Sequence, residues 1–382
     1  MDVRLTEDQR LLKQTVEDFL ARETSSALDR ALDDEERFPF DLFSKLADAG
    51  LIGHFIPLEY GGLGLGPVET VIIMETLTHG SVVASSILMP TSLGSQILLH
   101  GGTEEQRQTL LPEIVAGRAR VSFGLSEPHS GSDAASLKLR AVRVGDEYVL
   151  NGTKMWSTGA NVATHLMVAA RTDVDVPNHK GISVLIVDAD APGITVSPIK
   201  TLGSRAQATC QVFYDDVRVP AARLLGGQAG LGQGWRYLNA SLALERLEMA
   251  AMAVGLAQRA LEDAIAFVNE REAFGKKVGE FQAIRHMAAS NAIRIEAARA
   301  LTYRAAGLMA AGEPCNKEIV MAKIFATETQ TQVCLDGVQM LGGYGYSMEF
   351  DMQRYLRRAL VGTIGGGTSQ VLRDVVARQI GM

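Results

Sequence analysis

The sequence lacks the features of several large classes of protein. Its 382 residues carry 37 Lys and Arg against 44 Asp and Glu, a net charge of −7, so the clustered basic excess that nucleic-acid binding needs is missing. No apolar run is long enough to cross a bilayer, and the stretch from Met1 to Arg10 is charged from its second residue, with no signal-peptide core. We therefore expect no nucleic acid or membrane as partner, and a cytoplasmic location.

Cysteine and histidine are also sparse and scattered. Cys210, Cys315 and Cys334 lie far apart, without the paired spacing of a zinc site or a redox dithiol, which favours buried thiols. None of the seven histidines forms a helical pair with a carboxylate. The sequence therefore predicts no metal site.

The composition that is present suits a large folded chain. Hydrophobic residues make up 47% and charged residues 21%, so a sizeable core and two or three structural units are expected. From Leu5 to about Gly117 the apolar spacing is helical, and a helix is expected from Pro39 to Ala49, ending at Gly50. Pro67 and Thr103 have the character of helix starts, the latter with acids at the positive end of the helix dipole.

Around Val121 the pattern changes to short β-type runs. Strands are expected over 165–170, 182–187 and 209–214, with Asn151-Gly152 as a hairpin turn. After the glycine-rich stretch 226–234 the chain is predicted to be helical to its end, with four or five helices. The predicted fold is mostly α with a central β domain, divided into residues 1–120, 121–225 and 226–382.

This order of elements argues against a nicotinamide-binding Rossmann domain. No βαβ alternation is present, so a parallel nucleotide-binding sheet is not expected. The glycine clusters at 61–64, 230–232 and 365–367 also fail the GxGxxG spacing.

One carboxylate stands out in the helix that follows Gly234. Glu245 falls on the apolar face formed by Leu238, Leu242, Met249, Met252 and Leu256. Desolvation among these side chains raises a carboxyl pKa toward the range of a general base. An ion pair with a neighbour such as Arg246 explains the pattern equally well, and periodicity alone leaves both open.

Six segments, in order and spacing, resemble signatures of the acyl-CoA dehydrogenase family. They are EYGGLG (59–64), SEPHSGSD (126–133), NGTKMW (151–156), REAFG (271–275), QMLGG (339–343) and GTSQ (367–370). The resemblance implies a helical N-terminal domain, a middle β-barrel domain and a C-terminal four-helix bundle, assembled as a homotetramer with one FAD per subunit.

The resemblance also implies roles for residues at the cofactor. Leu125 and Ser126 would hydrogen-bond the isoalloxazine edge, Trp156 would cover the ring, and Thr158 would reach the flavin N5. A second group of residues would contact FAD that is bound mainly by a neighbouring subunit: Arg271, Phe274, Gln282, Gln339 and Gly343. Among them, Arg271 would bind the pyrophosphate through two charge-assisted hydrogen bonds. Thr368 and Gln370 resemble contacts at the other end of the dinucleotide, and Thr368 also suits a helix N-cap.

The expected catalytic position departs from most of the family. The usual glutamate is replaced by Gly366, but members of the isovaleryl-CoA dehydrogenase branch carry their glutamate on the first bundle helix, where Glu245 matches. Gly365 stands where the isovaleryl-type members also have glycine, which implies room for a branched acyl group. Ser132 and Arg246 match substrate contacts. Ala243 replaces an aspartate that commonly binds the pantetheine arm.

The resemblance thus implies that Glu245 removes the α-proton of an acyl thioester while the β-hydrogen leaves as hydride to FAD. Electrons would pass to an electron-transfer flavoprotein, with oxygen as a second acceptor. A short or branched acyl-CoA is the expected substrate. The alternatives are a biosynthetic desaturase or oxidase acting on a carrier-protein thioester, suggested by Ala243, and a non-catalytic FAD-binding subunit, suggested by Gly366.

Overall fold

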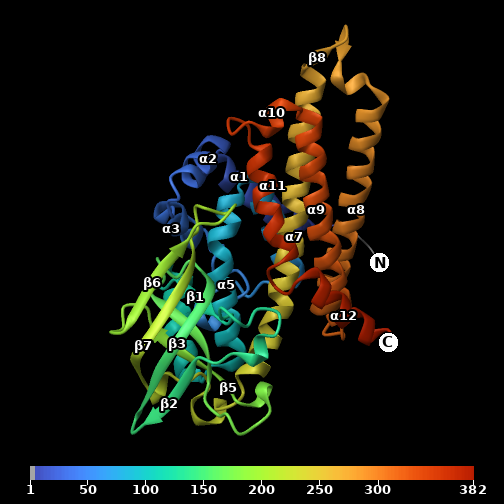
Figure 1. The fold of residues 1–382 in the computed structure, drawn as a ribbon. Coiled ribbons are helices and arrows are strands. Elements are labelled where there is room, and N and C mark those ends of the chain that lie inside the picture. Colours follow the sequence, from blue (N-terminus) through green and yellow to red (C-terminus); the bar gives the residue numbers. More distant parts are fainter. Residues whose placement is uncertain (1–4) are drawn as a thin grey trace.

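The computed structural model describes residues 5–382, in which a helical region, a β region and a second helical region follow one another (Figure 1). The first region contains α1 (Glu7–Glu23), α2 (Ser26–Asp34), α3 (Phe40–Asp48), α4 (Pro67–Gly80), α5 (Val82–Gly101) and α6 (Glu104–Val115). The strands are β1 (Val121–Gly124), β2 (Arg140–Val144), β3 (Glu147–Thr158), β4 (His165–Arg171), β5 (Ile182–Asp188), β6 (Ile194–Ile199) and β7 (Thr209–Pro220).

Three long helices dominate the last region. The elements are α7 (Gly234–Glu270), the short strands β8 (Glu272–Ala273) and β9 (Lys276–Lys277), α8 (Gln282–Ala310), α9 (Asn316–Leu341), α10 (Gly343–Tyr346), α11 (Met352–Ala359) and α12 (Ser369–Gln379). The predicted class, mostly helical with a central β unit, is confirmed.

Local sequence signals explain where several helices begin. α4 starts at Pro67, whose missing N–H costs nothing at the first helical position. Thr103 accepts from the N–H of Gln106, whose side chain accepts in return from the N–H of Thr103, a capping box that starts α6. Thr368 accepts from the N–H of Val371 at the start of α12, as its N-cap role predicts.

The strands form one mixed sheet in the order β1-β4-β2-β3-β7-β6, with β5 paired to β4. The expected hairpin turn at Asn151-Gly152 is wrong, because β3 runs through both residues and pairs with β2 on one side and β7 on the other. Asn151 instead bonds Asp216, accepting from its N–H at 3.0 Å, where the β3–β7 register shifts. The conformation of Asn151-Gly152 is therefore set by contact with β7 and not by local turn preference.

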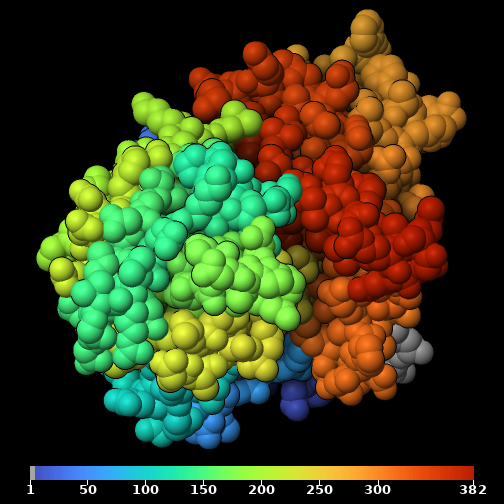
Figure 2. All heavy atoms as spheres, turned by 60° about the horizontal axis from the view of Figure 1, so that its bottom comes forward, coloured from blue at the N-terminus to red at the C-terminus, as the bar shows by residue number. Residues whose placement is uncertain are grey.

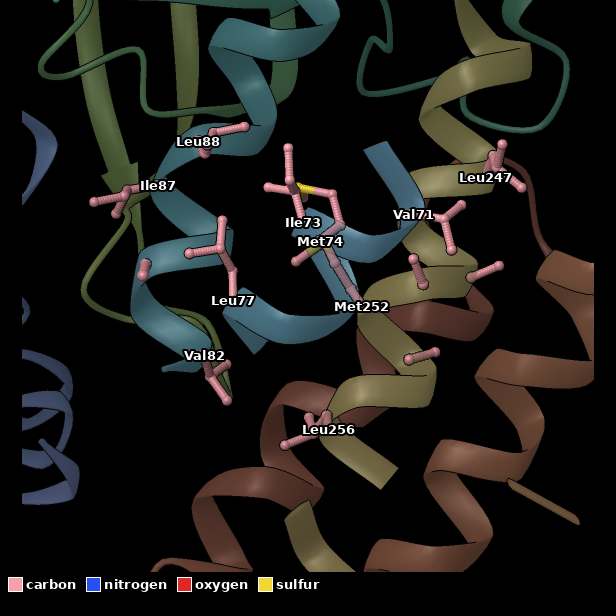
Figure 3. Close-up of a cluster of buried hydrophobic side chains, with 14 of the residues drawn as sticks. Val71, Ile73, Met74, Leu77, Val82, Ile87, Leu88, Leu247, Met252 and Leu256 are labelled. Atoms are coloured by element: carbon pink, nitrogen blue, oxygen red, sulfur yellow. The ribbon is translucent and has the colours of Figure 1, made fainter. Parts of the chain in front are cut away.

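The helical regions share one core. Side chains of α4 lie between α5 and α7, as the labelled residues Val71, Met74 and Leu77 in Figure 3 show. A Cβ added at Gly255 of α7 would lie 2.3 Å from the carbonyl oxygen of Glu75 in α4, so the two backbones are in contact. This packing fixes the position of α7, which carries Glu245.

By length and composition alone, α5 is apolar enough to cross a membrane, and it is the one such helix within residues 5–382. Its most apolar window is 78% buried by the rest of the chain, as in the core helix of a folded domain. The three cysteines are buried and unpaired, as expected.

The sheet and the last helical region meet on one face of the molecule, coloured green and orange to red in Figure 2. The β8–β9 hairpin follows the C-terminal end of α7 and lies far from the seven-stranded sheet in Figure 1. One end of α7 is therefore close to the β region, and the other end reaches the tip of the bundle.

Candidate active site

Glu245 lies where α7 passes the loop Gly365–Gly367, called here the glycine loop, which precedes α12. Its Oε2 is shielded from solvent and, within residues 5–382, has no hydrogen-bond partner. Burial raises the pKa of the Glu245 carboxyl above its ordinary value, and the charges of Arg246 and Lys323 act against that rise. An unpaired buried carboxylate is costly in a purely structural role and is typical of a group that exchanges a proton.

Arg246 does not form the ion pair that periodicity left open. Its Nε donates to the carbonyl oxygen of Gly366 at 3.0 Å, and within residues 5–382 no guanidinium nitrogen of Arg246 pairs with the carboxylate of Glu245. Lys323 of α9, fully buried, donates from Nζ to the carbonyl oxygen of Gly367 at 2.8 Å. Two cations thus hold the glycine loop by its carbonyl groups and leave Glu245 free.

The same two hydrogen bonds orient the loop. With both carbonyl groups held, the N–H groups of Gly366 and Gly367 have no acceptor within residues 5–382. Unused backbone N–H groups beside a buried base are the donors that a developing oxyanion needs. The loop can therefore stabilise negative charge on a carbonyl oxygen placed next to Glu245.

The backbone at 366 favours glycine, whereas the backbone at 365 could carry a side chain. Gly366 has φ +63°, and a Cβ there would lie 2.7 Å from Sδ of Met249. Gly365 is not in the left-handed region, and its Cβ would meet Met249 Cε at 3.6 Å, an ordinary contact. The left-handed backbone and the nearby Met249 sulfur thus both disfavour a side chain at 366, so the carboxylate beside this loop is that of Glu245 on α7.

Glu248 is a second buried acid that sequence reasoning missed. Its Oε1 accepts from Ser92 Oγ of α5 at 2.6 Å, while its Oε2 has no partner in the described residues. Burial, together with the nearby charge of Glu245, raises the pKa of Glu248 to about 8, so it is mostly protonated at neutral pH. The three-residue spacing after Glu245 on an apolar helix was a signal that could have found it.

The predicted flavin residues at the sheet come together. Ser126, just after β1, accepts at its carbonyl oxygen from the N–H of Met155 at 2.8 Å, which brings Leu125 and Ser126 beside Trp156. Thr158 is the last residue of β3, and its carbonyl oxygen accepts from Ser122 Oγ of β1 at 2.8 Å. These four residues thus lie along neighbouring ends of β1 and β3.

Trp156 has the properties of a surface that covers a flat ligand. It sits in a bulge of β3 with φ +62°, and its side chain is 56% exposed. Strained backbone at a large exposed aromatic residue is typical of functional sites. The neighbouring Ser157 Oγ is buried without a hydrogen-bond partner in residues 5–382. The site fits an aromatic cofactor with polar edges.

A buried ion pair holds the loop after β1 in place. Lys154 Nζ donates to Glu127 Oε1 at 2.8 Å and to the carbonyl oxygen of Leu125 at 3.0 Å. Glu127 also accepts from the N–H groups of Lys138 and Leu139, so its charge is fully compensated. Both residues stand in the segments 126–133 and 151–156 but were not assigned a role from the sequence.

The remaining predicted cofactor residues lie at the other end of the bundle. Arg271 follows the last residue of α7, about 39 Å along the helix axis from Glu245 at roughly 1.5 Å per residue. Phe274, in the β8–β9 hairpin, is 95% exposed with φ +53°. The other members of this group are Gln282 at the start of α8, Gln339 near the end of α9, and Gly343 at the start of α10. A single chain does not bring them to Trp156.

Three predicted residues lie elsewhere on the surface or at helix ends. Ser132 is exposed in the loop before β2. Thr368 caps α12, and Gln370 is exposed in its first turn. None of the three makes a contact in this chain that assigns it to a ligand.

Comparison with known proteins places the whole chain in one group. Residues 6–118, 122–217 and 232–381 match the N-terminal, middle and C-terminal domains of acyl-CoA dehydrogenase. The chain is 39% identical to the probable acyl-CoA dehydrogenase YngJ of Bacillus subtilis over 100% of both chains. It is 37% identical to mitochondrial isovaleryl-CoA dehydrogenase of Pongo abelii, over 98% of this chain and 89% of that protein. The structure of butyryl-CoA dehydrogenase from Megasphaera elsdenii superposes with a TM-score of 0.94 at 30% identity, over 100% of both chains.

Proposed function

Because the chain belongs to the acyl-CoA dehydrogenase family of FAD-dependent oxidoreductases, we propose that it desaturates a short or branched acyl-CoA between the α and β carbons, with Glu245 as the base. The observation that carries this proposal is the buried, unpaired Oε2 of Glu245 beside the free N–H groups of Gly366 and Gly367. FAD, when bound, supplies the acceptor for the β-hydride.

Glu245 breaks the Cα–H bond by taking the proton on Oε2. Electrons from that bond form the new double bond as the β-hydrogen leaves with its own electron pair. Negative charge develops meanwhile on the thioester carbonyl oxygen, and the unpaired N–H groups of Gly366 and Gly367 stabilise it. Lys323 and Arg246 keep these N–H groups in position through the loop carbonyls.

The charge state of the base depends on the same two cations. A general base works best when its pKa lies near the working pH, and burial moves the pKa of Glu245 upward in that direction. Arg246 and Lys323 limit the rise, so that the carboxylate form stays accessible. Glu248 stays mostly neutral at pH 7 and adds no second full charge.

The cofactor site is proposed to need two chains. Leu125, Ser126, Trp156 and Thr158 would hold the isoalloxazine ring in one chain, while the Arg271 and Phe274 end of a neighbouring bundle would hold the rest. The distance along α7 between Glu245 and Arg271 supports this division. We propose a homotetramer for this reason, with Gln282, Gln339 and Gly343 in the same contact and Thr368 and Gln370 at the other end of FAD.

Substrate and electron acceptor are also proposals. The absence of a side chain at Gly365 leaves room next to Met249 for a branch near the reacting carbons. Ser132 and Arg246 are proposed contacts to the CoA part, and an electron-transfer flavoprotein is the proposed acceptor, in the cytoplasm. The non-catalytic alternative is disfavoured by the buried, unpaired Oε2 of Glu245.

The test is an anaerobic flavin assay. Purified protein loaded with FAD is mixed with isovaleryl-CoA, butyryl-CoA and the same acyl groups on a carrier protein, and the flavin absorbance is followed. Rapid bleaching by an acyl-CoA supports the proposal. Bleaching by the carrier-bound thioesters alone would favour the biosynthetic alternative, and no bleaching by any thioester would contradict both.

A further inference from the structure

A fully buried lysine precedes the exposed Trp156 by two residues on β3. Lys154 Nζ donates to Glu127 Oε1 at 2.8 Å and to the carbonyl oxygen of Leu125 at 3.0 Å. Lysine is rarely buried completely, because its charge must then leave water. The two hydrogen bonds offset part of that cost, and one of them reaches a residue of the expected flavin site.

The buried charges around Lys154 do not cancel. Glu127 is the carboxylate that pairs with Lys154, and it also acts on the charge of Arg171 in β4. Arg171 donates to backbone carbonyl oxygens, among them that of Leu137 at 3.1 Å, and forms no ion pair within 4 Å in the part of the chain that the structure describes. Two cations thus share one carboxylate.

The ammonium of Lys154 keeps its charge in this setting. Burial lowers the pKa of Lys154 to about 8, and the charge of Glu127 acts against that change. Lys154 is therefore mostly protonated at pH 7. The cluster of Lys154, Glu127 and Arg171 carries a positive excess next to the end of β1.

The hydrogen bond from Lys154 to Leu125 sets the direction of the next N–H group. In a planar trans peptide, the carbonyl oxygen of one residue and the N–H of the next point in opposite directions. Because the Leu125 oxygen is turned toward Lys154 Nζ, the N–H of Ser126 points away from the ammonium. This N–H has no acceptor within residues 5–382, and Ser126 is only half-buried. It is an unused donor that a ligand can reach.

Ser126 is also held on its other side. Its carbonyl oxygen accepts from the N–H of Met155 at 2.8 Å, and the N–H of Glu127 donates to the carbonyl oxygen of Ser130 at 3.0 Å. Both peptide groups of Ser126 are therefore fixed before a ligand binds. A donor that is fixed in advance costs no further ordering of the loop on binding.

The stem of Lys154 has little space in which to move. A Cβ added at Gly124 of β1 would lie 3.1 Å from Lys154 Cγ and 3.6 Å from Ser157 Oγ. The backbone of β1 thus packs closely against the lysine side chain. This contact and the two hydrogen bonds keep the ammonium where it reaches the Leu125 oxygen.

These features match what a flavin needs when it is reduced. Two-electron reduction increases the electron density on the ring nitrogens and carbonyl oxygens of the isoalloxazine. A fixed N–H donor and a positive charge nearby therefore bind the reduced ring more tightly than the oxidised ring, which raises its reduction potential.

We propose that Lys154 is a positioning residue for the flavin: through Leu125 it directs the Ser126 N–H to a carbonyl oxygen of the isoalloxazine and so favours the reduced cofactor. The positive excess of Lys154 and Arg171 over Glu127 acts in the same direction. This inference rests on the proposed dehydrogenation, in which FAD accepts the hydride. It assigns part of the driving force for that step to a side chain that acts through the backbone.

The test is the midpoint potential of FAD in the holoprotein, measured by slow reduction beside a reference dye. In Lys154→Met, reduced flavin should lose at least about tenfold more affinity than oxidised flavin, which moves the midpoint of this two-electron couple by about 30 mV to more negative values. The carbonyl stretching bands of the oxidised flavin, recorded by vibrational difference spectroscopy, should move to higher frequency, because a hydrogen bond to the ring is lost.

Lys138→Met is the matched control. Lys138 is exposed, and it contributes only its backbone N–H to Glu127. Because solvent screens an exposed charge, this change should alter the ratio of the two flavin affinities less than about twofold and leave the carbonyl bands in place.

A double variant keeps the test decisive if Lys154→Met does not fold. Lys154→Met leaves Glu127 buried without its cation, whereas Lys154→Met combined with Glu127→Gln removes both charges of the pair. The Leu125 oxygen still loses its donor, so the midpoint and the carbonyl bands should move in the same directions as in the single variant.

The outcomes separate this inference from the proposed function. An unchanged midpoint and unchanged carbonyl bands without Lys154 overturn its positioning role, and the dehydrogenase assignment stands if an acyl-CoA reduces the wild type. Equal losses of affinity for oxidised and reduced flavin also overturn it, because a purely structural lysine would weaken both alike. If the wild type holds FAD but no thioester reduces it, the proposed dehydrogenation falls, and the midpoint comparison still decides the role of Lys154.

Discussion

Replacing Glu248 with glutamine is expected to change how stability depends on pH. The pKa of Glu248 is raised by burial to about 8 in the folded chain, against an ordinary value of 4.5. Below about pH 4.5 the carboxyl is neutral in both states. As the pH rises from 4.5 to 8, the unfolded chain ionises while the folded chain does not, so the wild type loses stability over this window.

The size of the effect follows from that interval. A span of about 3.5 pKa units at about 1.4 kcal/mol per unit corresponds to roughly 5 kcal/mol. Glutamine carries no titrating proton and can still accept from Ser92 Oγ, so Glu248→Gln avoids the loss. We expect the unfolding temperature of the variant to rise relative to wild type by about 5–10 °C between pH 4.5 and pH 8, and to stay level above that.

The assay is thermal unfolding of both FAD-loaded proteins across this pH range. Glu262→Gln on the same helix is the control. Burial raises the pKa of Glu262, but hydrogen bonds from Gln258 and His79 outweigh this and lower it. Removing the Glu262 carboxylate should therefore destabilise the protein at neutral pH. A difference between Glu248→Gln and wild type that does not vary with pH would refute the reasoning.

Three further changes have defined outcomes. Lys323→Met removes a charge that lowers the pKa of Glu245, so the acidic limb of the kcat/KM profile against pH should move to higher pH, while Lys323→Arg should leave it nearly unchanged; an unmoved limb in Lys323→Met would contradict this role. Gly365→Tyr fills the space beside Met249, so isovaleryl-CoA should lose about 10- to 100-fold more kcat/KM than butyryl-CoA, and equal losses would show that this space is not used. Phe274→Ala should weaken both FAD retention and assembly, measured by sedimentation and flavin content, and a monomer that keeps FAD tightly would argue against a shared site.

The sequence predicted best what depends on neighbours along the chain. The starts of α4, α6 and α12 follow from Pro67, Thr103 and Thr368, because caps act within one turn. Asn151-Gly152 failed as a turn because its side chain meets Asp216 on another strand. The position of Glu245 on an apolar face was predictable from helical spacing.

The partners of Glu245 were not predictable in the same way. Lys323 is 78 positions away on another helix, and only the packing of α9 on α7 brings it to the glycine loop. Periodicity also could not decide whether Arg246 pairs with Glu245 or holds Gly366. Sequence patterns give the face on which a side chain lies, whereas its counter-charge depends on the tertiary fold.

The most direct test of the account is the rate of flavin reduction in Glu245→Gln. Glutamine keeps the size of the side chain but cannot accept a proton at neutral pH, so FAD content and assembly should match the wild type. Bleaching by a verified acyl-CoA substrate in a rapid-mixing experiment should slow by about 10²–10⁴-fold or more. Reduction of FAD by Glu245→Gln at near wild-type speed would contradict the account, because Glu245 would then not be the base.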